Sequence, residues 1–219
     1  MMQNKTNLLN KLFEEWEKHS LYKDENFIRD GIIDETLFNQ ADLKILFITK
    51  EANDPGQTVN WDFREWWREN IRYAFSYRLA EWSFGLLNDF PCYDKVWEKE
   101  GAAHEALKRV AFMNVKKSGG SGKSDFNTIL NHIQNNIKFI RREIEIIEPE
   151  VIITGLSWQG LRDELFPGLK WVKSGYSVHI ARFKQAKVID FYHPSSRNAP
   201  AAVYSLLGNI VNTKMFRNL

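Results

Sequence analysis

The sequence is poor in cysteine, because Cys92 is the only one among 219 residues. One thiol can form neither a disulfide within the chain nor a cysteine-based metal cluster. The apolar runs are also short, since KILFIT and VIITGL hold far fewer than the roughly 20 residues that a membrane-spanning helix needs. The N-terminal stretch is charged throughout and lacks the apolar segment of a signal peptide. These absences predict a cytoplasmic protein without a membrane partner.

The chain also lacks a strong excess of either charge, because 30 basic residues nearly balance 28 acidic ones. A net charge of +2 neither demands nor excludes a nucleic-acid partner. The five histidines are scattered without metal-ligand spacing, so we expect no metal and no other cofactor. Aromatic residues are abundant, at 14% of the chain. The length predicts a single domain over residues 1–219, in which the aromatic-rich helical segment 57–100 is an elaboration.

Short apolar runs alternate with helical patterns along the chain. Runs rich in β-branched and aromatic residues predict strands at 43–49, 109–115, 150–155 and 187–192, and a further strand or sheet edge at 176–183. Apolar residues at helical spacing predict helices at 7–18, 61–90, 103–108, 126–147, 157–165 and 199–213. This alternation predicts an α/β fold, a three-layer α/β/α sandwich around a central, mostly parallel four-stranded sheet.

Polar side chains come at the carboxyl ends of three predicted strands. Glu51 follows the first strand, Asn114 ends the second, and His193 follows the last. Each of these residues alone is as readily a solvated or turn-capping group. In parallel sheets, however, ligands bind at the carboxyl ends of the strands. A carboxylate, an amide and an imidazole on one rim therefore favour a functional site.

These motifs, in this order, resemble those of the uracil-DNA glycosylase superfamily. ILFITKEAND resembles the first motif of that family, FMNVKK its strand ending in Asn, and YHPSS its His-Pro-Ser motif. IEIIEPEVIITGLSWQGL is similar to a helix–Pro–strand–Gly segment of the bacterial iron–sulfur branch. The resemblance covers roughly residues 43–56 and 105–210. That branch uses four cysteines, so the single Cys92 excludes its cluster here.

The resemblance implies a uracil-DNA glycosylase-like fold and a role for each matching residue. Glu51 would activate the attacking water, with Asn53 as the alternative for this role. His193 would donate a hydrogen bond to the leaving base, and Asn114 would bind the pyrimidine edge. An aromatic ring would stack on the flipped base. The candidates for stacking are Phe63, Trp66 and Trp67.

DNA phosphates would be held by hydroxyls and by a basic, glycine-rich loop. Arg197 lies where the family places the segment that enters the duplex and supports base flipping. The phosphate-binding candidates are Lys116, Lys117, Lys123, Ser195 and Ser196.

The implied activity is that of a monofunctional DNA glycosylase, a monomer that hydrolyses the N-glycosidic bond of a flipped pyrimidine and leaves an abasic site. Where the best-known uracil enzymes carry a Tyr beside C5 of the base, this chain has Asn53. The smaller side chain leaves room there. The substrate is therefore either uracil, which implies base excision in DNA repair, or a C5-modified cytosine of phage DNA, hydroxymethylated or glycosylated, which implies antiviral defence.

Two other functions remain open. GGSGKS, residues 119–124, matches part of a P-loop, which would make the protein an NTPase, but Lys117 stands where that pattern needs Gly. A non-catalytic nucleic-acid-binding module on the same fold would keep Ser195, Arg197 and the lysines, and it would not need Glu51.

Overall fold

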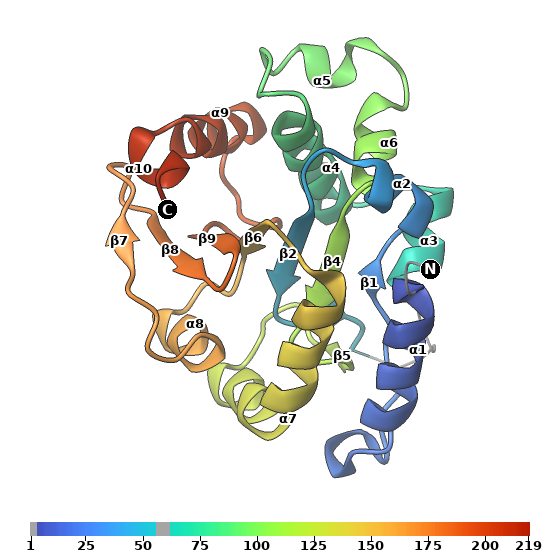
Figure 1. The fold of residues 1–219 in the computed structure, drawn as a ribbon. Helices are drawn as coiled ribbons and strands as arrows, with labels where there is room; N and C mark the ends of the chain where they lie inside the picture. The colour runs from blue at the N-terminus through green and yellow to red at the C-terminus, as the bar shows by residue number, and fades with distance from the viewer. Residues whose placement is uncertain (1–3, 56–61) are drawn as a thin grey trace.

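The structure is a computed structural model, which describes residues 4–55 and 62–219. In these parts of the chain, seven strands form one sheet in the order β1-β4-β2-β6-β9-β8-β7 (Figure 1). Two further short strands, β3 and β5, pair with each other in parallel. The strands are β1 (Gly31–Ile32), β2 (Ile45–Thr49), β3 (Ala52–Asn53), β4 (Ala111–Asn114), β5 (Gly119–Gly120), β6 (Val151–Thr154), β7 (Val172–Lys173), β8 (His179–Phe183) and β9 (Ala186–Asp190).

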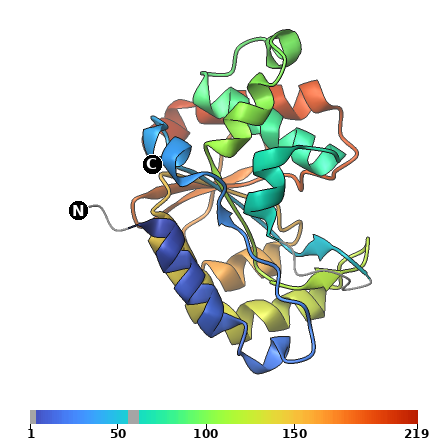
Figure 2. The same ribbon diagram turned by 90° about the vertical axis from the view of Figure 1, so that its right-hand side faces the viewer.

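Helices flank the sheet on both faces (Figure 2). Within residues 4–55 and 62–219, none has the length and apolar character needed to cross a bilayer. The helices are α1 (Lys5–Trp16), α2 (Glu35–Gln40), α3 (Phe63–Glu69), α4 (Ala74–Leu87), α5 (Lys95–Glu98), α6 (Ala102–Lys108), α7 (Phe126–Ile147), α8 (Gln159–Leu165), α9 (Pro200–Val211) and α10 (Lys214–Arg217), with a 3-10 turn, η1, at Ser20–Tyr22.

The predicted α/β class, with helices around a central sheet, is confirmed, but the prediction of a mostly parallel four-stranded sheet was wrong. The described sheet has seven strands and is mixed, with three parallel and three antiparallel pairings. The parallel pairings join β4, β2, β6 and β9, and the antiparallel strands β1, β8 and β7 extend both edges. Strands β1 and β7 have two residues each, too few for a periodic signal, whereas β8 lies within the strand or sheet edge expected at 176–183.

Strand β2 lies inside the sheet between β4 and β6, and all five of its residues are buried. Because side chains alternate between the two faces of a strand, Ile45 and Phe47 join one hydrophobic core, and Leu46 and Ile48 join the other. A central strand buried on both faces reads as a continuous apolar run, as ILFI does.

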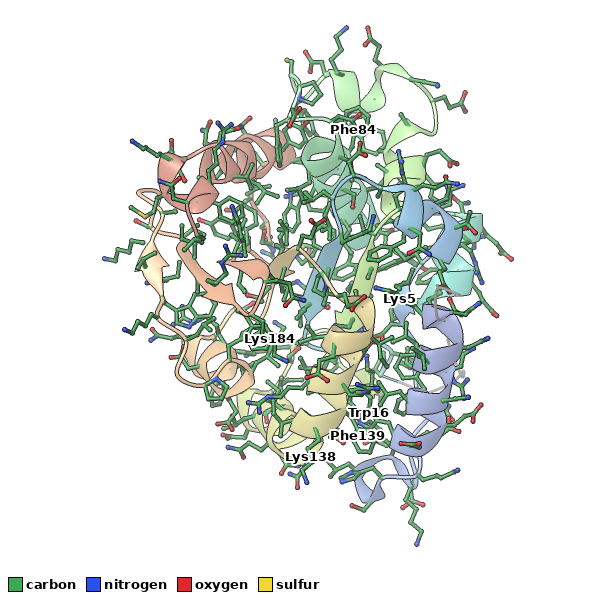
Figure 3. All side chains as sticks on the ribbon, viewed as in Figure 1. Lys5, Trp16, Phe84, Lys138, Phe139 and Lys184 are labelled. Atoms are coloured by element: carbon green, nitrogen blue, oxygen red, sulfur yellow. The ribbon has the colours of Figure 1, made fainter. Side chains whose placement is uncertain are left out.

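The two cores belong to different groups of helices. The first core is covered by helices α3, α4, α6 and α9. The described part of segment 57–100 therefore contributes to this core, for example through Trp67 and Trp82. Helices α1, α7 and α8 pack on the second. There, Trp16 of α1 and Phe139 of α7 stack with ring centroids 5.4 Å apart (Figure 3).

Candidate active site

A cavity of about 820 Å³ opens at the carboxyl ends of the parallel strands β2, β6 and β9. Its volume lies in the upper part of the range of about 300–1,000 Å³ that is usual for ligand sites. The position agrees with the rule that open α/β sheets bind ligands at this edge. The predicted site residues that line this cavity are Glu51, Asn53, Lys123, His193, Ser195 and Ser196.

Glu51 is held at the cavity by an ion pair with Lys116. Lys116 Nζ lies 2.9 Å from Glu51 Oε2, and both side chains are 6% exposed. The same ammonium also donates to the carbonyl oxygen of Gly119. The carboxylate packs so closely over Gly120 that a Cβ at that position would overlap it. This ion pair and this glycine together fix the place of the carboxylate.

The backbone around Glu51 is equally well held. The short strands β3 and β5 pair Ala52 with Gly119 and Asn53 with Gly120. The Lys116 N–H donates to the carbonyl oxygen of Lys50 at 2.9 Å. The loop after β4 therefore serves as a platform for the loop after β2, and the side chain of Asn53 is exposed on the cavity side of this platform.

His193 reaches the cavity from the turn that follows β9. The Ser196 N–H donates to the His193 carbonyl oxygen at 2.8 Å, which closes the turn. Gly155 makes room for it at the end of β6, because a Cβ there would lie 3.2 Å from His193 Cα. The imidazole packs against Phe75, with ring centroids 5.6 Å apart.

The hydrogen bonds of His193 define which of its nitrogens is the donor. The Ser195 N–H donates to Nδ1 at 3.2 Å, so the neutral ring carries its hydrogen on Nε2. Burial, reinforced by the nearby Lys50 ammonium, lowers the pKa of His193 to about 4. At neutral pH the ring is therefore an uncharged hydrogen-bond donor through Nε2.

The aromatic residues predicted to stack on a base lie elsewhere. Phe63 and Trp67 are buried and pack on Phe112 in the core beside the sheet, with centroid distances of 5.3 and 4.7 Å. Trp66 packs edge-on against Tyr73 at 5.6 Å. None of the three predicted rings is among the residues that line the cavity. Apolar packing against the sheet explains their positions.

Two other exposed rings do line the cavity, Trp158 before α8 and Tyr192 after β9. They are 36% and 42% exposed. Their flanking letters, SWQ and FYH, carry no periodic signal that separates a ligand-facing ring from a packing ring.

Asn114 is also not a cavity residue. Its side chain ends β4 beside β2 and is 2% exposed, and Oδ1 accepts a hydrogen bond from Thr49 Oγ1 at 2.6 Å. Its backbone N–H donates to Asp30 Oδ2 at 2.8 Å. Asn114 thus joins two strand ends, and its contact with the pyrimidine edge stays a prediction that the cavity lining does not support.

The lysines after β4 are buried, which contradicts the prediction that they contact phosphates. Lys117 is fully buried, with Nζ 2.5 Å from Asp30 Oδ1 and 2.7 Å from Glu143 Oε2. Burial raises the pKa of Glu143. Lys116 is engaged with Glu51, as described above. Of the three predicted lysines, Lys123 alone is exposed at the cavity, and exposed Arg197 lies beyond its lining.

The loop 119–124 is not shaped as a P-loop. Gly119 and Gly120 form β5, and helix α7 begins at Phe126. The side chain of Asp125 caps that helix by accepting the Thr128 N–H at 2.8 Å. This carboxylate occupies the helix N-terminus where a P-loop would bind phosphate. An NTPase therefore has no support in the geometry.

Comparison with known proteins identifies no family. The sequence matches no protein-family model. No curated protein matches it either. Within the described residues, no group of three or more His, Cys, Asp and Glu side chains is arranged to hold a metal ion.

Two charged cavity residues were missed from the sequence, Lys50 and Asp190. Asp190 ends β9, and its carboxylate accepts hydrogen bonds from Thr154 Oγ1 at 3.1 Å and from Arg162 Nη1 at 2.9 Å. Burial raises the pKa of Asp190. The pattern of KVIDFY predicts one apolar strand, so the acid near its end gives no signal of its own. Lys50 directly precedes Glu51 and gives no separate signal either.

Proposed function

We propose that the protein is a DNA glycosylase that hydrolyses the N-glycosidic bond of a pyrimidine flipped into the cavity of about 820 Å³. The observation that carries this proposal is the presence of Glu51 and His193 on one cavity at the carboxyl ends of β2 and β9. A fixed carboxylate and an uncharged donor are the two groups that this reaction needs. The motif resemblance of the sequence supports the same assignment.

In this proposal, cleavage of the bond between C1′ and the base nitrogen leaves a cationic sugar and an anionic base. Glu51 stabilises the sugar cation, orients a water molecule toward C1′ and takes its proton. His193 Nε2–H donates to the base oxygen on which negative charge develops. The hydroxyl of the water stays on C1′, and the product is an abasic site. Asn53 lines the same cavity and stays the alternative residue for positioning the water.

Lys123, Ser195 and Ser196 are proposed to contact the DNA backbone beside the flipped nucleotide. Extrusion of a stacked base costs a few kcal/mol, which contacts of this kind offset. Trp158 and Tyr192 replace the originally expected rings as the candidates for stacking on the base.

The base is either uracil or a C5-modified cytosine of phage DNA. The size of the cavity and the exposed side chain of Asn53 support the larger base. Hydroxyl groups on a C5 substituent would find donors and acceptors in Gln159 and Ser177 on the cavity wall. Excision of uracil would indicate repair, and excision of the modified base would indicate antiviral defence.

The test is an oligonucleotide panel with uracil, thymine mismatches, hydroxymethylcytosine or glucosylated hydroxymethylcytosine, each scored for alkali-labile abasic sites. We expect excision of one class, and a loss of roughly 10²–10⁴-fold in the isosteric Glu51→Gln variant. Excision of uracil alone would rule out the modified base. If no base is excised and Glu51→Gln binds DNA like the unaltered protein, the non-catalytic module is the better description.

A further inference from the structure

Lys50 lines the cavity with a half-buried side chain that forms no ion pair with a carboxylate of the described residues. Its Nζ lies 3.3 Å from Ser157 Oγ and 4.8 Å from the centre of the Trp158 ring. Lys116 and Lys117, by contrast, are each paired with carboxylates at 2.9 Å or less. Lys116 and Lys117 are therefore held in ion pairs within the fold, whereas the Lys50 amine can contact a ligand in the cavity.

The surroundings of Lys50 make its ammonium easier to deprotonate than that of a fully solvated lysine. Burial lowers the pKa of Lys50, although the adjacent Glu51 carboxylate acts in the opposite direction. The ammonium also lies close enough to His193 to lower the pKa of that ring. The deprotonated amine of a lysine with a lowered pKa is a nucleophile toward carbonyl carbon.

We propose that Lys50 forms an imine with the abasic sugar in the cavity, so that the protein also cleaves the DNA strand at abasic sites. This inference rests on the proposed function, which supplies the abasic sugar next to Glu51. It adds a lyase step to an enzyme that the sequence alone led us to expect as monofunctional.

The step uses the ring-opened aldehyde form of the abasic sugar. The Lys50 Nζ lone pair attacks C1′, and water leaves as the C1′=Nζ bond forms. The Glu51 carboxylate then takes a proton from C2′, a double bond forms between C2′ and C3′, and the C3′–O bond breaks. The departing group is the phosphate of the 3′ strand. Water hydrolyses the imine, which returns the free amine of Lys50 and an unsaturated aldehyde on the 5′ strand.

The experiment supplies an oligonucleotide with a preformed abasic site, so it does not depend on base excision. The full chain is incubated with this DNA and sodium borohydride, which reduces an imine to a stable amine. We expect a covalent protein–DNA adduct, and peptide mapping by mass spectrometry should place it on Lys50. Without borohydride, we expect strand cleavage that needs no alkali.

Two variants separate Lys50 from other amines. Lys50→Arg keeps the positive charge but cannot form an imine, and its adduct and cleavage should fall to the level seen without protein. Lys138→Arg, on the exposed face of α7 (Figure 3), should trap as much DNA as the unaltered protein. Absence of an adduct, an adduct mapped to another residue, or full trapping by Lys50→Arg would overturn the inference. A protein that excises bases but traps nothing would keep the proposed glycosylase and lose the lyase.

Discussion

In the proposed reaction, the hydrogen on His193 Nε2 is the donor that stabilises the leaving base. Its position follows from the Ser195 N–H bound to Nδ1 and from the pKa of about 4. We expect His193→Ala to lower single-turnover excision by roughly 10²–10³-fold, the usual effect of losing one such donor. Rates are measured on the substrate found in the oligonucleotide panel.

His193→Gln is the conservative comparison, because its amide can still donate a hydrogen bond from a similar place. It should recover part of the rate that His193→Ala loses. Equal rates in His193→Ala and the unaltered protein would remove His193 from the proposed chemistry.

Lys116 belongs to the same scale, because it is the partner that makes a buried Glu51 carboxylate tolerable. Replacing one partner of a buried ion pair usually costs about 3–5 kcal/mol of unfolding free energy. We expect Lys116→Met to approach this loss in urea unfolding, since both side chains are 6% exposed. The double variant Lys116→Met, Glu51→Gln should be more stable than Lys116→Met alone.

The exposed Lys138→Met is the matched control, with an expected change within about 0.5 kcal/mol. Additive effects of the Lys116 and Glu51 substitutions would show that the two side chains do not interact in solution.

At the scale of elements, the pairing of β3 with β5 holds the loop of Glu51 in place, although each of these strands has only two residues. Gly120→Ala introduces a Cβ that overlaps the Glu51 carboxylate. The variant should therefore displace the carboxylate without replacing Glu51. We expect a larger loss of excision than in Gly122→Ala, where the new Cβ would lie 3.9 Å from Asn53 Oδ1. Excision rates and far-ultraviolet circular dichroism on both variants are the measurements. Similar rates in the two variants would contradict this role of β5.

The elements that were predicted correctly are those with a long or uniform pattern. Helix α7 was predicted with its observed bounds, because its apolar stripe is long and a Pro follows Glu148. Strand β2 was predicted because both of its faces are buried. Strands β1, β3, β5 and β7 have two residues each, too few for a periodic signal.

From the sequence, a site residue could be predicted only where its position directly after a strand also places its side chain at the cavity. Glu51 and His193 follow strand ends and do line the cavity. Lys117 has the same kind of position, but its partners Asp30 and Glu143 come from distant segments, and sequence spacing does not show that they meet. Tertiary packing thus decides whether a charged side chain near a strand end is buried in an ion pair or exposed at the cavity.

For the whole molecule, the buried His132 and the half-buried His193 predict loss of stability in acid. Burial lowers the pKa of His132 to about 4, and its Nδ1 lies 3.2 Å from the Tyr22 hydroxyl. His193 has a similarly lowered pKa of about 4. An unfolded histidine has a pKa near 6.5, so the unfolded chain binds more protons between pH 6.5 and 4. Stability is therefore full above about pH 6.5 and falls as the pH drops through this window.

The expected loss at pH 4 is on the order of 2–3 kcal/mol for His132, measured by urea unfolding at several pH values. His132→Gln keeps an acceptor for the Tyr22 hydroxyl but does not titrate. Its stability should depend less on pH in this window than that of the unaltered protein. Parallel pH curves for the two proteins would contradict the role assigned to His132.

The order β4-β2-β6-β9 also bears on how the molecule reaches its native state. Each neighbour in this parallel group comes from a remote part of the chain, and such long-range pairing slows folding. Glu51 is made early during synthesis, but His193 joins it only after β9 has left the ribosome. A nascent chain that lacks the last segment can bury part of its core, yet it has no complete cavity. Because Asp190, Tyr192 and His193 all lie at or directly after β9, the cavity is complete only in a chain in which this strand is paired with β6.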